Sequence, residues 1–195
     1  MRPRYAAIVL AAGSATRFGS DKLSALLDGE PLLFHAIRAA RAAPVARVVV
    51  VARHGLDTGE WPGTPPVEAL RITSTALSES LKAGVAAAAD CDGAFVFLGD
   101  MPCVPHRAAT RLAALIGDGY AAMPRFEGKP GHPVLLSAAA FSDIVRLSGD
   151  EGAGRLLRGR GDVVFDACTD PATHFDVDRP EDLEALANRG RSGTE

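Results

Sequence analysis

The sequence predicts an α/β fold, a Rossmann-like domain in which helices cover both faces of a mostly parallel sheet. Short apolar runs alternate along the chain with segments whose apolar residues recur at helical spacing. Strands that are apolar throughout have no side for solvent, so helices must cover both faces of the sheet. Three polar clusters follow predicted strands or precede the last helix: the loop after Leu10, Asp100 after Leu98, and the acidic run before Pro180. Such sheets bind ligands at the carboxyl ends of their strands.

Each predicted element has a local signal. The strands are short apolar runs at residues 5–10, 47–52, 71–73, 94–98, 120–126, 133–136 and 163–165. The helices show apolar spacing of 3.6, often with proline or serine near the first turn, at residues 31–42, 78–89, 105–116, 138–147, 152–157 and 180–188. Glycines and prolines around Trp61 predict a loop at 53–69. Residues 1–188 are expected to form one domain, and the small polar residues 189–195 a disordered tail.

Composition narrows the class of protein. The chain has 195 residues, 47% of them apolar, and a formal charge of −3 without a basic block, which gives a nucleic-acid partner little support. No apolar run is long enough to cross a membrane, and the glycine turn after residue 10 favours a first strand over a signal peptide. Cys91, Cys103 and Cys168 include no C-x-x-C pair, which fits a reducing cytoplasm and gives no sign of a zinc site.

The stretch LAAGSATRFGSDK, from Leu10 to Lys22, is the most informative in the chain. A glycine-rich turn at the end of a strand presents backbone N–H groups to a ligand. Arg17 and Lys22 add two cations, and the combination suits a polyphosphate. The glycine spacing matches neither the Walker loop nor the dinucleotide fingerprint. We therefore expect a nucleotide loop of a third kind, with ordinary solvated surface cations as the alternative.

Acidic residues predict a metal site beside this loop. Asp100 follows a buried strand in FVFLGDMPCV and is well placed to hold Mg²⁺ together with phosphate oxygens, unless it only caps a helix or a turn. Asp176 and Asp178 alternate in the extended segment FDVDRPEDL, so their side chains point in opposite directions and only one faces the ligand. Asp178 is either a second metal ligand or a cap for the last helix.

Three further motifs have two interpretations each. His132 in PGHPV either contacts an anionic substrate or bonds to the backbone of its turn. Ser78 and Ser80 either cap the helix that they open or offer hydroxyl and N–H groups to a phosphate. The glycines of GDEGAG, residues 149–154, either let a substrate approach the backbone or form a turn. The sequence contains no G-x-S-x-G elbow or other nucleophile–base arrangement, so no covalent intermediate is expected.

Taken in order, LAAGSATRFGSDK, GDMP, GHPVLL, GDEGAGRLL and DVDRPEDL resemble the motifs of the MobA/MocA-like nucleotidyltransferases over nearly the whole chain. The GHPV and GDEGA segments are most similar to those of the molybdenum cofactor cytidylyltransferases, the MocA type. The resemblance implies a nucleotide-diphospho-sugar transferase-like domain at 1–188. It also implies a cytoplasmic EC 2.7.7-type enzyme that uses Mg²⁺ to transfer a nucleotidyl group with release of pyrophosphate.

The resemblance also implies roles for particular residues. The catalytic residues would be Arg17, Lys22 and Asp100, with Asp100 and Asp178 as metal ligands. Gly131 and His132 would belong to the acceptor side. The nucleotide would be bound by Leu10, Ala11, Ala12, Gly13, Arg17, Lys22 and Ser80.

The same resemblance favours particular substrates. Cytidylyl members of the family tend to carry Ala-Ala-Gly where guanylyl members carry Ala-Gly-Gly, so Ala11-Ala12-Gly13 favours CTP over GTP. The implied acceptor is the terminal phosphate of molybdopterin, and a molybdoenzyme or its maturation factor is the implied partner. The alternatives are a GTP-dependent relative, transfer to a sugar phosphate, methylerythritol phosphate or phospholactate, a non-catalytic chaperone that binds a nucleotide and a cofactor, and a Rossmann-like domain that binds only an anion.

Overall fold

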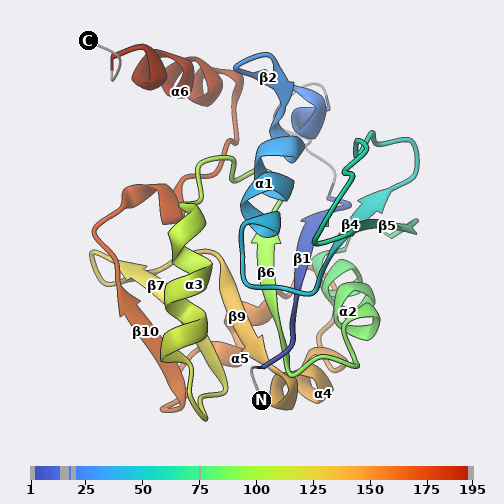
Figure 1. Ribbon diagram of the computed structural model, residues 1–195, viewed down its shortest axis with the longest axis vertical. Helices are drawn as coiled ribbons and strands as arrows, with labels where there is room; N and C mark the ends of the chain where they lie inside the picture. The colour runs from blue at the N-terminus through green and yellow to red at the C-terminus, as the bar shows by residue number, and fades with distance from the viewer. Residues whose placement is uncertain (1–2, 14–17, 19–20, 75, 193–195) are drawn as a thin grey trace.

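The computed structural model describes residues 3–13, 18, 21–74 and 76–192. Its sheet has the strand order β10-β7-β9-β6-β1-β4-β5, and the short strand β8 pairs with β7 (Figure 1). The strand bounds are β1 Tyr5–Ala11, β4 Arg47–Arg53, β5 Val67–Ile72, β6 Gly93–Leu98, β7 Ala121–Phe126, β8 Lys129–Pro130, β9 Val134–Ser137 and β10 Val163–Ala167. The pairs β1–β4, β1–β6, β4–β5 and β7–β10 are parallel, and β9 runs antiparallel between β6 and β7. The sheet is mostly parallel, as predicted.

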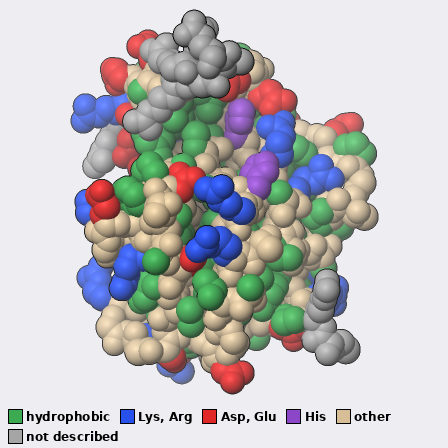
Figure 2. All heavy atoms as spheres, turned by 60° about the vertical axis from the view of Figure 1, so that its left-hand side comes forward, with side chains coloured by type: hydrophobic (Ala, Val, Ile, Leu, Met, Phe, Trp, Pro, Cys, Tyr) green, Lys and Arg blue, Asp and Glu red, His purple; other side chains and the backbone are tan. Residues whose placement is uncertain are grey.

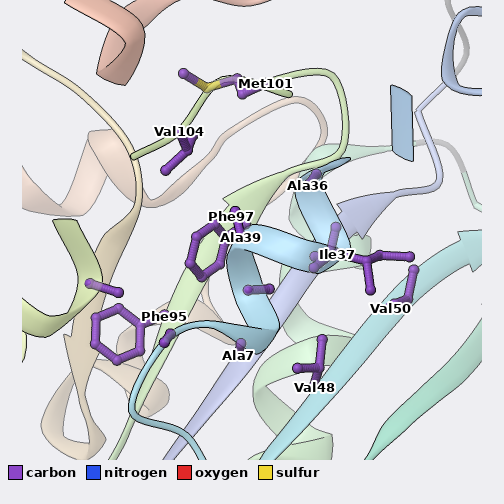
Figure 3. Packing of buried hydrophobic residues seen from close by; sticks show 14 of the residues in the cluster. Ala7, Ala36, Ile37, Ala39, Val48, Val50, Phe95, Phe97, Met101 and Val104 are labelled. Carbon is purple, nitrogen blue, oxygen red and sulfur yellow. The ribbon is translucent and has the colours of Figure 1, made fainter. Parts of the chain in front are cut away.

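Helices cover both faces of this sheet. One face carries α1 (Leu32–Arg41) and α3 (His106–Leu115), and the other carries α2 (Leu77–Ala87), α4 (Phe141–Ile144) and α5 (Ala153–Leu157) (Figure 1). The strands supply both cores because successive side chains point to opposite faces. Val9 of β1 packs on the α1 side and Ile8 on the α2 side. Figure 3 shows Phe97 of β6 beside Ala39 of α1, with Phe95 and Ile37 in the same core.

The last helix, α6 (Pro180–Ser192), lies apart from these two layers at one end of the molecule (Figure 1). It packs against a small antiparallel pair, β2 (Leu26–Leu27) and β3 (Glu30–Pro31), in a third cluster that includes Leu27, Val177 and Leu183. The helix extends into the segment from residue 189 that the sequence predicts to be a tail, and residues 193–195 lie outside the described part of the chain.

Two predicted elements differ from the structure. β5 begins at Val67, inside the predicted loop, because six of its residues pair with β4 from Val48 to Arg53. The predicted helix at 138–147 is instead a 3₁₀ turn followed by the short α4. The 3₁₀ turns at Lys22–Ser24 and Pro171–His174 and the pair β2–β3 were not predicted. Elements of two to four residues are too short to show a hydrophobic period.

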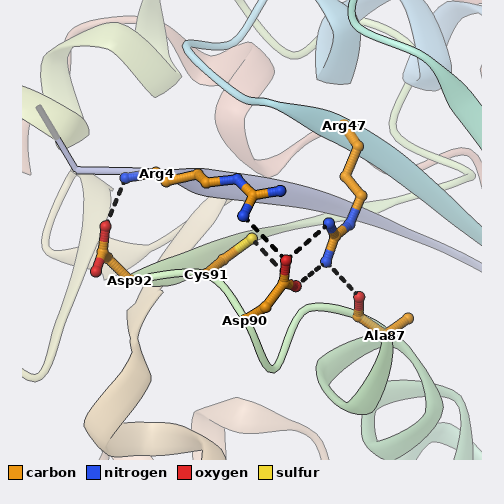
Figure 4. A network of polar contacts seen from close by, with 6 residues as sticks. All are labelled: Arg4, Arg47, Ala87, Asp90, Cys91 and Asp92. Carbon is orange, nitrogen blue, oxygen red and sulfur yellow. Dashed lines mark hydrogen bonds and ion pairs between the residues drawn. The ribbon is translucent and has the colours of Figure 1, made fainter.

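Ion pairs hold the sheet together away from the predicted ligand-binding edge. Before the first residues of β1 and β6, Asp90 pairs with Arg4 at 3.0 Å and with Arg47, and Arg4 N donates to Asp92 at 2.6 Å (Figure 4). The hydrogen bond from Arg47 lowers the pKa of Asp90 to about 2. This network ties together the amino ends of three neighbouring strands.

The face over α3, β7 and β10 carries many basic side chains and histidines (Figure 2). Arg111 of α3 donates two hydrogen bonds, of 2.8 and 2.6 Å, to the buried Asp166 of β10. The Arg125 guanidinium lies 3.3 Å from the centre of the Phe165 ring. These cations fasten the edge strand β10 to the fold.

In the described part of the chain, no helix is long and apolar enough to cross a bilayer.

Candidate active site

The glycine loop and Asp100 meet at the carboxyl ends of β1, β4 and β6. Leu10 of β1 pairs with Val51 and Leu98 of the neighbouring strands, so the three strands end at one level. Gly99 N donates to Leu10 O at 3.0 Å, which places Asp100 beside the start of the loop. A pocket of about 520 Å³ opens here, lined by Leu10, Ala11, Ala12, Gly13, Asp21, Lys22, Leu23, Arg53, Leu77, Ser80, Leu98, Asp100 and Asp150.

Lys22 forms the charged centre of this pocket. Its Nζ lies 2.7 Å from Asp100 Oδ2 and 3.4 Å from Asp178 Oδ1. The exposed fractions of the side chains rise outward, from 12% for Lys22 and 24% for Asp100 to 54% for Asp178. Burial alone would lower the pKa of Lys22, but hydrogen bonds and charge attraction from the two carboxylates outweigh it and raise that pKa. Lys22 is therefore an ammonium ion held between two carboxylates.

Backbone contacts explain how Asp178 reaches Lys22. The buried Val177 donates its N–H to Asp100 O at 3.0 Å, which fixes the acidic segment alongside the end of β6. The cap of α6 is formed by Asp182, whose Oδ2 accepts from the N–H groups of residues 178 and 179 at 2.9 and 2.8 Å. The Asp178 carboxylate thus contacts Lys22 and does not cap the helix.

Asp176 lies outside the ion pairs of this centre. Partial desolvation by surrounding protein atoms raises its pKa, and the negative charges of Asp178 and Asp100 add to the effect. Of the two alternating aspartates, only Asp178 contacts Lys22, although Asp178 is not among the residues that line the pocket.

The carboxylates around Lys22 fit a divalent cation. Both Asp100 and Asp178 reach a single cationic atom, and carboxylate oxygens are the ligands that Mg²⁺ uses together with phosphate oxygens and water. Within the described ranges, no group of three or more histidine, cysteine, aspartate or glutamate side chains is arranged to hold a metal. A metal at this position therefore needs phosphate or water oxygens to complete its coordination.

The opposite wall of the pocket comes from the start of α2. Ser80 lines the pocket, and its Oγ donates to Ala76 O at 3.3 Å. Ala76 occupies the cap position without a side-chain hydrogen bond, so neither serine caps the helix. Ser78 is fully buried; its N–H donates to Gly149 O at 3.1 Å, and its Oγ has no hydrogen-bond partner among the described residues. The loop that begins at Gly149 therefore rests on the start of α2.

Six lining residues were not among the predicted site residues: Asp21, Leu23, Arg53, Leu77, Leu98 and Asp150. Arg53 could have been found, because it follows the buried run 47–52 as Asp100 follows the run 94–98. Asp150 belongs to the GDEGAG motif, in which the sequence predicts a role only for the glycines. Arg17, the second predicted phosphate cation, lies outside the described residues.

Gly131 and His132 do not line the pocket. A Cβ on Gly131 would lie 2.5 Å from Thr173 O, so this glycine packs directly on the turn at Pro171–His174. His132 N donates to Thr173 O at 2.8 Å. Burial lowers the pKa of the His132 imidazole, although the negative charge of Asp100 opposes this. His132 is therefore neutral near pH 7 and lies within electrostatic range of the charged centre.

Comparison with known proteins identifies the family. Residues 7–164 match the MobA-like NTP transferase domain. The chain belongs to the MobA-like NTP transferase family. This confirms the resemblance found in the sequence, and it makes the protein a nucleotidyltransferase, an enzyme of the EC 2.7.7 type.

Individual relatives support this assignment. Purine catabolism protein PucB of Bacillus subtilis (strain 168) is 30% identical over 94% of this chain and 96% of PucB. A 2-C-methyl-D-erythritol 4-phosphate cytidylyltransferase of Laribacter hongkongensis (strain HLHK9) is 37% identical over 56% of this chain and 51% of that enzyme. Rv0371c of Mycobacterium tuberculosis H37Rv, solved in complex with manganese, has a TM-score of 0.78 and 22% identity, and the match covers 95% of this chain and 98% of that one. The predicted fold class is confirmed.

Proposed function

We propose that the protein transfers CMP from CTP to the terminal phosphate of molybdopterin and releases pyrophosphate. The observation that carries the proposal is the partly buried Lys22 ammonium between Asp100 and Asp178 at the mouth of the glycine loop. The Ala11-Ala12-Gly13 sequence supports CTP, as does the likeness to an enzyme named as a cytidylyltransferase. The GHPV and GDEGA segments support molybdopterin as the acceptor and a molybdoenzyme or its maturation factor as the partner.

The nucleotide would lie between two walls of the pocket. The backbone of Ala11, Ala12 and Gly13 and the start of α2 at Ser80 would hold the base and ribose. Lys22 would leave the two carboxylates and contact the triphosphate, and Arg17 would add a second cation. Cations and backbone N–H groups stabilise the charge that develops on the leaving pyrophosphate.

Asp100 and Asp178 would hold Mg²⁺, and the manganese complex of Rv0371c supports a divalent metal in this fold. When bound, such an ion neutralises phosphate charge and acts as a Lewis acid on phosphoryl oxygens. The aspartates contribute by fixing its position between the glycine loop and the end of β6. Because Lys22 contacts the same two carboxylates, it would have to leave them before they bind the ion.

The acceptor needs no general base. A phosphate monoester has a second pKa near ~6, so it is largely dianionic at neutral pH and can attack directly. Its oxygen forms a bond to the α-phosphorus of CTP while the bond to the bridging oxygen breaks, and pyrophosphate leaves with that electron pair. The neutral His132 lies on the acceptor side and can hydrogen-bond without adding charge. The reaction then depends on positioning and charge compensation.

A matrix of nucleotides and acceptors tests this function. Each of CTP, GTP, ATP and UTP is combined with Mg²⁺ or Mn²⁺ and with molybdopterin, methylerythritol phosphate, phospholactate or a sugar phosphate, and pyrophosphate is measured. We expect the highest rate with CTP and molybdopterin. A higher rate with another pair would reassign the substrates, and CTP binding without pyrophosphate release from any pair would favour a cofactor chaperone.

A further inference from the structure

Arg53 lines the nucleotide pocket from a rigid position. It is the last residue of β4 and pairs with Ile72 of β5. Its carbonyl oxygen accepts a hydrogen bond from Arg71 Nη1 at 3.0 Å. β4 also pairs with β1 as far as Ala11, so Arg53 stands beside the point where the chain enters the glycine loop. The Arg53 side chain therefore starts from a fixed edge of the pocket.

This side chain holds the other end of the glycine loop. Arg53 Nη2 lies 2.5 Å from Asp21 Oδ2, and the same carboxylate oxygen accepts from Ser24 Oγ at 2.8 Å. Burial works against the charged form of Asp21, but hydrogen bonds from Arg53 and Ser24 and the Arg53 charge outweigh it and lower the pKa of Asp21. Asp21 is thus an anion fixed to the end of β4.

Asp21 directly precedes Lys22, and the two adjacent side chains are held from different strands. Asp21 is held by Arg53 at the end of β4, and Lys22 by Asp100 after the end of β6. β1, from which the loop emerges, lies between these two strands in the sheet. The exit of the loop is therefore held on both sides, by Arg53 through Asp21 and by Asp100 through Lys22.

We propose that Arg53 is a positioning residue that acts through Asp21 to keep Lys22 where the triphosphate binds. This inference rests on the proposed function. Direct phosphate binding by Arg53 is the competing role, and in that case the effects of Arg53 and Asp21 variants would be independent. The second competing role is a purely structural one. Partly exposed ion pairs contribute little to stability, so the fold should survive the loss of the Arg53–Asp21 pair.

The test compares Arg53→Gln, Asp21→Asn and the double variant with the wild type. The dissociation constant of CTP is measured by calorimetry, kcat and KM by pyrophosphate release, and stability by thermal unfolding. Arg38→Gln is the matched control, because the Arg38–Glu30 pair is of similar length at 2.6 Å and neither residue lines the pocket. We expect each single variant to weaken CTP binding and raise KM about tenfold, as for a misplaced charge-assisted hydrogen bond.

Non-additivity decides between the roles. If Arg53 acts through Asp21, the double variant binds CTP no more weakly than either single variant, and Arg53→Lys restores part of the affinity. Losses that multiply in the double variant would overturn the inference, as would an Arg53→Gln variant that behaves like Arg38→Gln. If the wild type binds CTP but releases no pyrophosphate, the proposed function fails while the binding data still test Arg53. If the wild type does not bind CTP, both fail.

Discussion

Replacing Lys22 with methionine should strengthen metal binding in the nucleotide-free protein, although it should abolish turnover. The Lys22 ammonium sits 2.7 Å from Asp100 Oδ2 and 3.4 Å from Asp178 Oδ1, where it competes with a metal for the same carboxylates. Methionine has a similar length and no charge, so it removes the competitor and leaves most of the packing. Loss of this predicted catalytic cation should therefore improve the binding of the metal.

The size of this effect follows from the contacts. Two unit charges about 4 Å apart attract by roughly 1 kcal/mol in water and by roughly 4 kcal/mol at an effective dielectric constant near 20. Asp178 is more than half exposed, so solvent screens its share toward the lower value. If only ~1.4 kcal/mol of competition remains after screening, the metal affinity changes about tenfold.

The assay is a titration of nucleotide-free protein with Mn²⁺, followed by electron paramagnetic resonance of the free ion. Lys82→Met is the control, because Lys82 forms an ordinary ion pair of 2.9 Å with Glu79 on the surface of α2 and does not line this pocket. We expect Lys22→Met to bind Mn²⁺ about tenfold more tightly than the wild type and Lys82→Met to match the wild type. An unchanged or weaker affinity in Lys22→Met would refute the shared position of ammonium and metal.

Three other changes separate function from folding. Asp100→Asn should lower the rate of pyrophosphate release about 100-fold or more if Asp100 is the proposed metal ligand, while the thermal midpoint changes little. Equal losses in Asp118→Asn, an exposed turn residue, would argue against a specific role. Gly131→Ala should cost about 1–3 kcal/mol in denaturant unfolding, because its Cβ would meet Thr173 O at 2.5 Å; unchanged stability would show that the turn can move. The pKa of Asp90 is lowered to about 2 in the folded protein from 3.8 in an unperturbed aspartate, so its ion pairs stabilise the fold above pH 4 and are lost as the pH falls through 2. The thermal midpoint of Asp90→Asn should therefore lie below that of the wild type at pH 7 and approach it near pH 2, and a constant difference would contradict this.

The sequence predicted the elements that have a strong periodic signal. The valine-rich run at 47–52 and the alanine-rich helix at 78–89 appear within two residues of their predicted ends. The sequence predicts β5 too short, because the glycines and prolines around Trp61 extend the predicted loop to residue 69. Its pairing with β4 is a tertiary interaction that no local pattern contains.

The candidate site was predicted from motif chemistry combined with sheet topology. Asp100 and Lys22 are 78 positions apart in the chain, and their proximity follows from the rule that parallel strands end at one edge. The role of Asp182 as the helix cap, which leaves Asp178 to contact Lys22, depends on the turn at residues 178–180 and could not be predicted. The Arg53–Asp21 pair likewise joins residues 32 positions apart without any shared motif.

The most direct measurement is a crystal structure with Mn²⁺ and a CTP analogue that cannot be cleaved between the α- and β-phosphates. We expect anomalous density for manganese on the carboxylates of Asp100 and Asp178, the base and ribose against the Ala11–Gly13 backbone, and Lys22 Nζ on a triphosphate oxygen. Manganese or triphosphate bound elsewhere, with Lys22 still between the two aspartates, would contradict this.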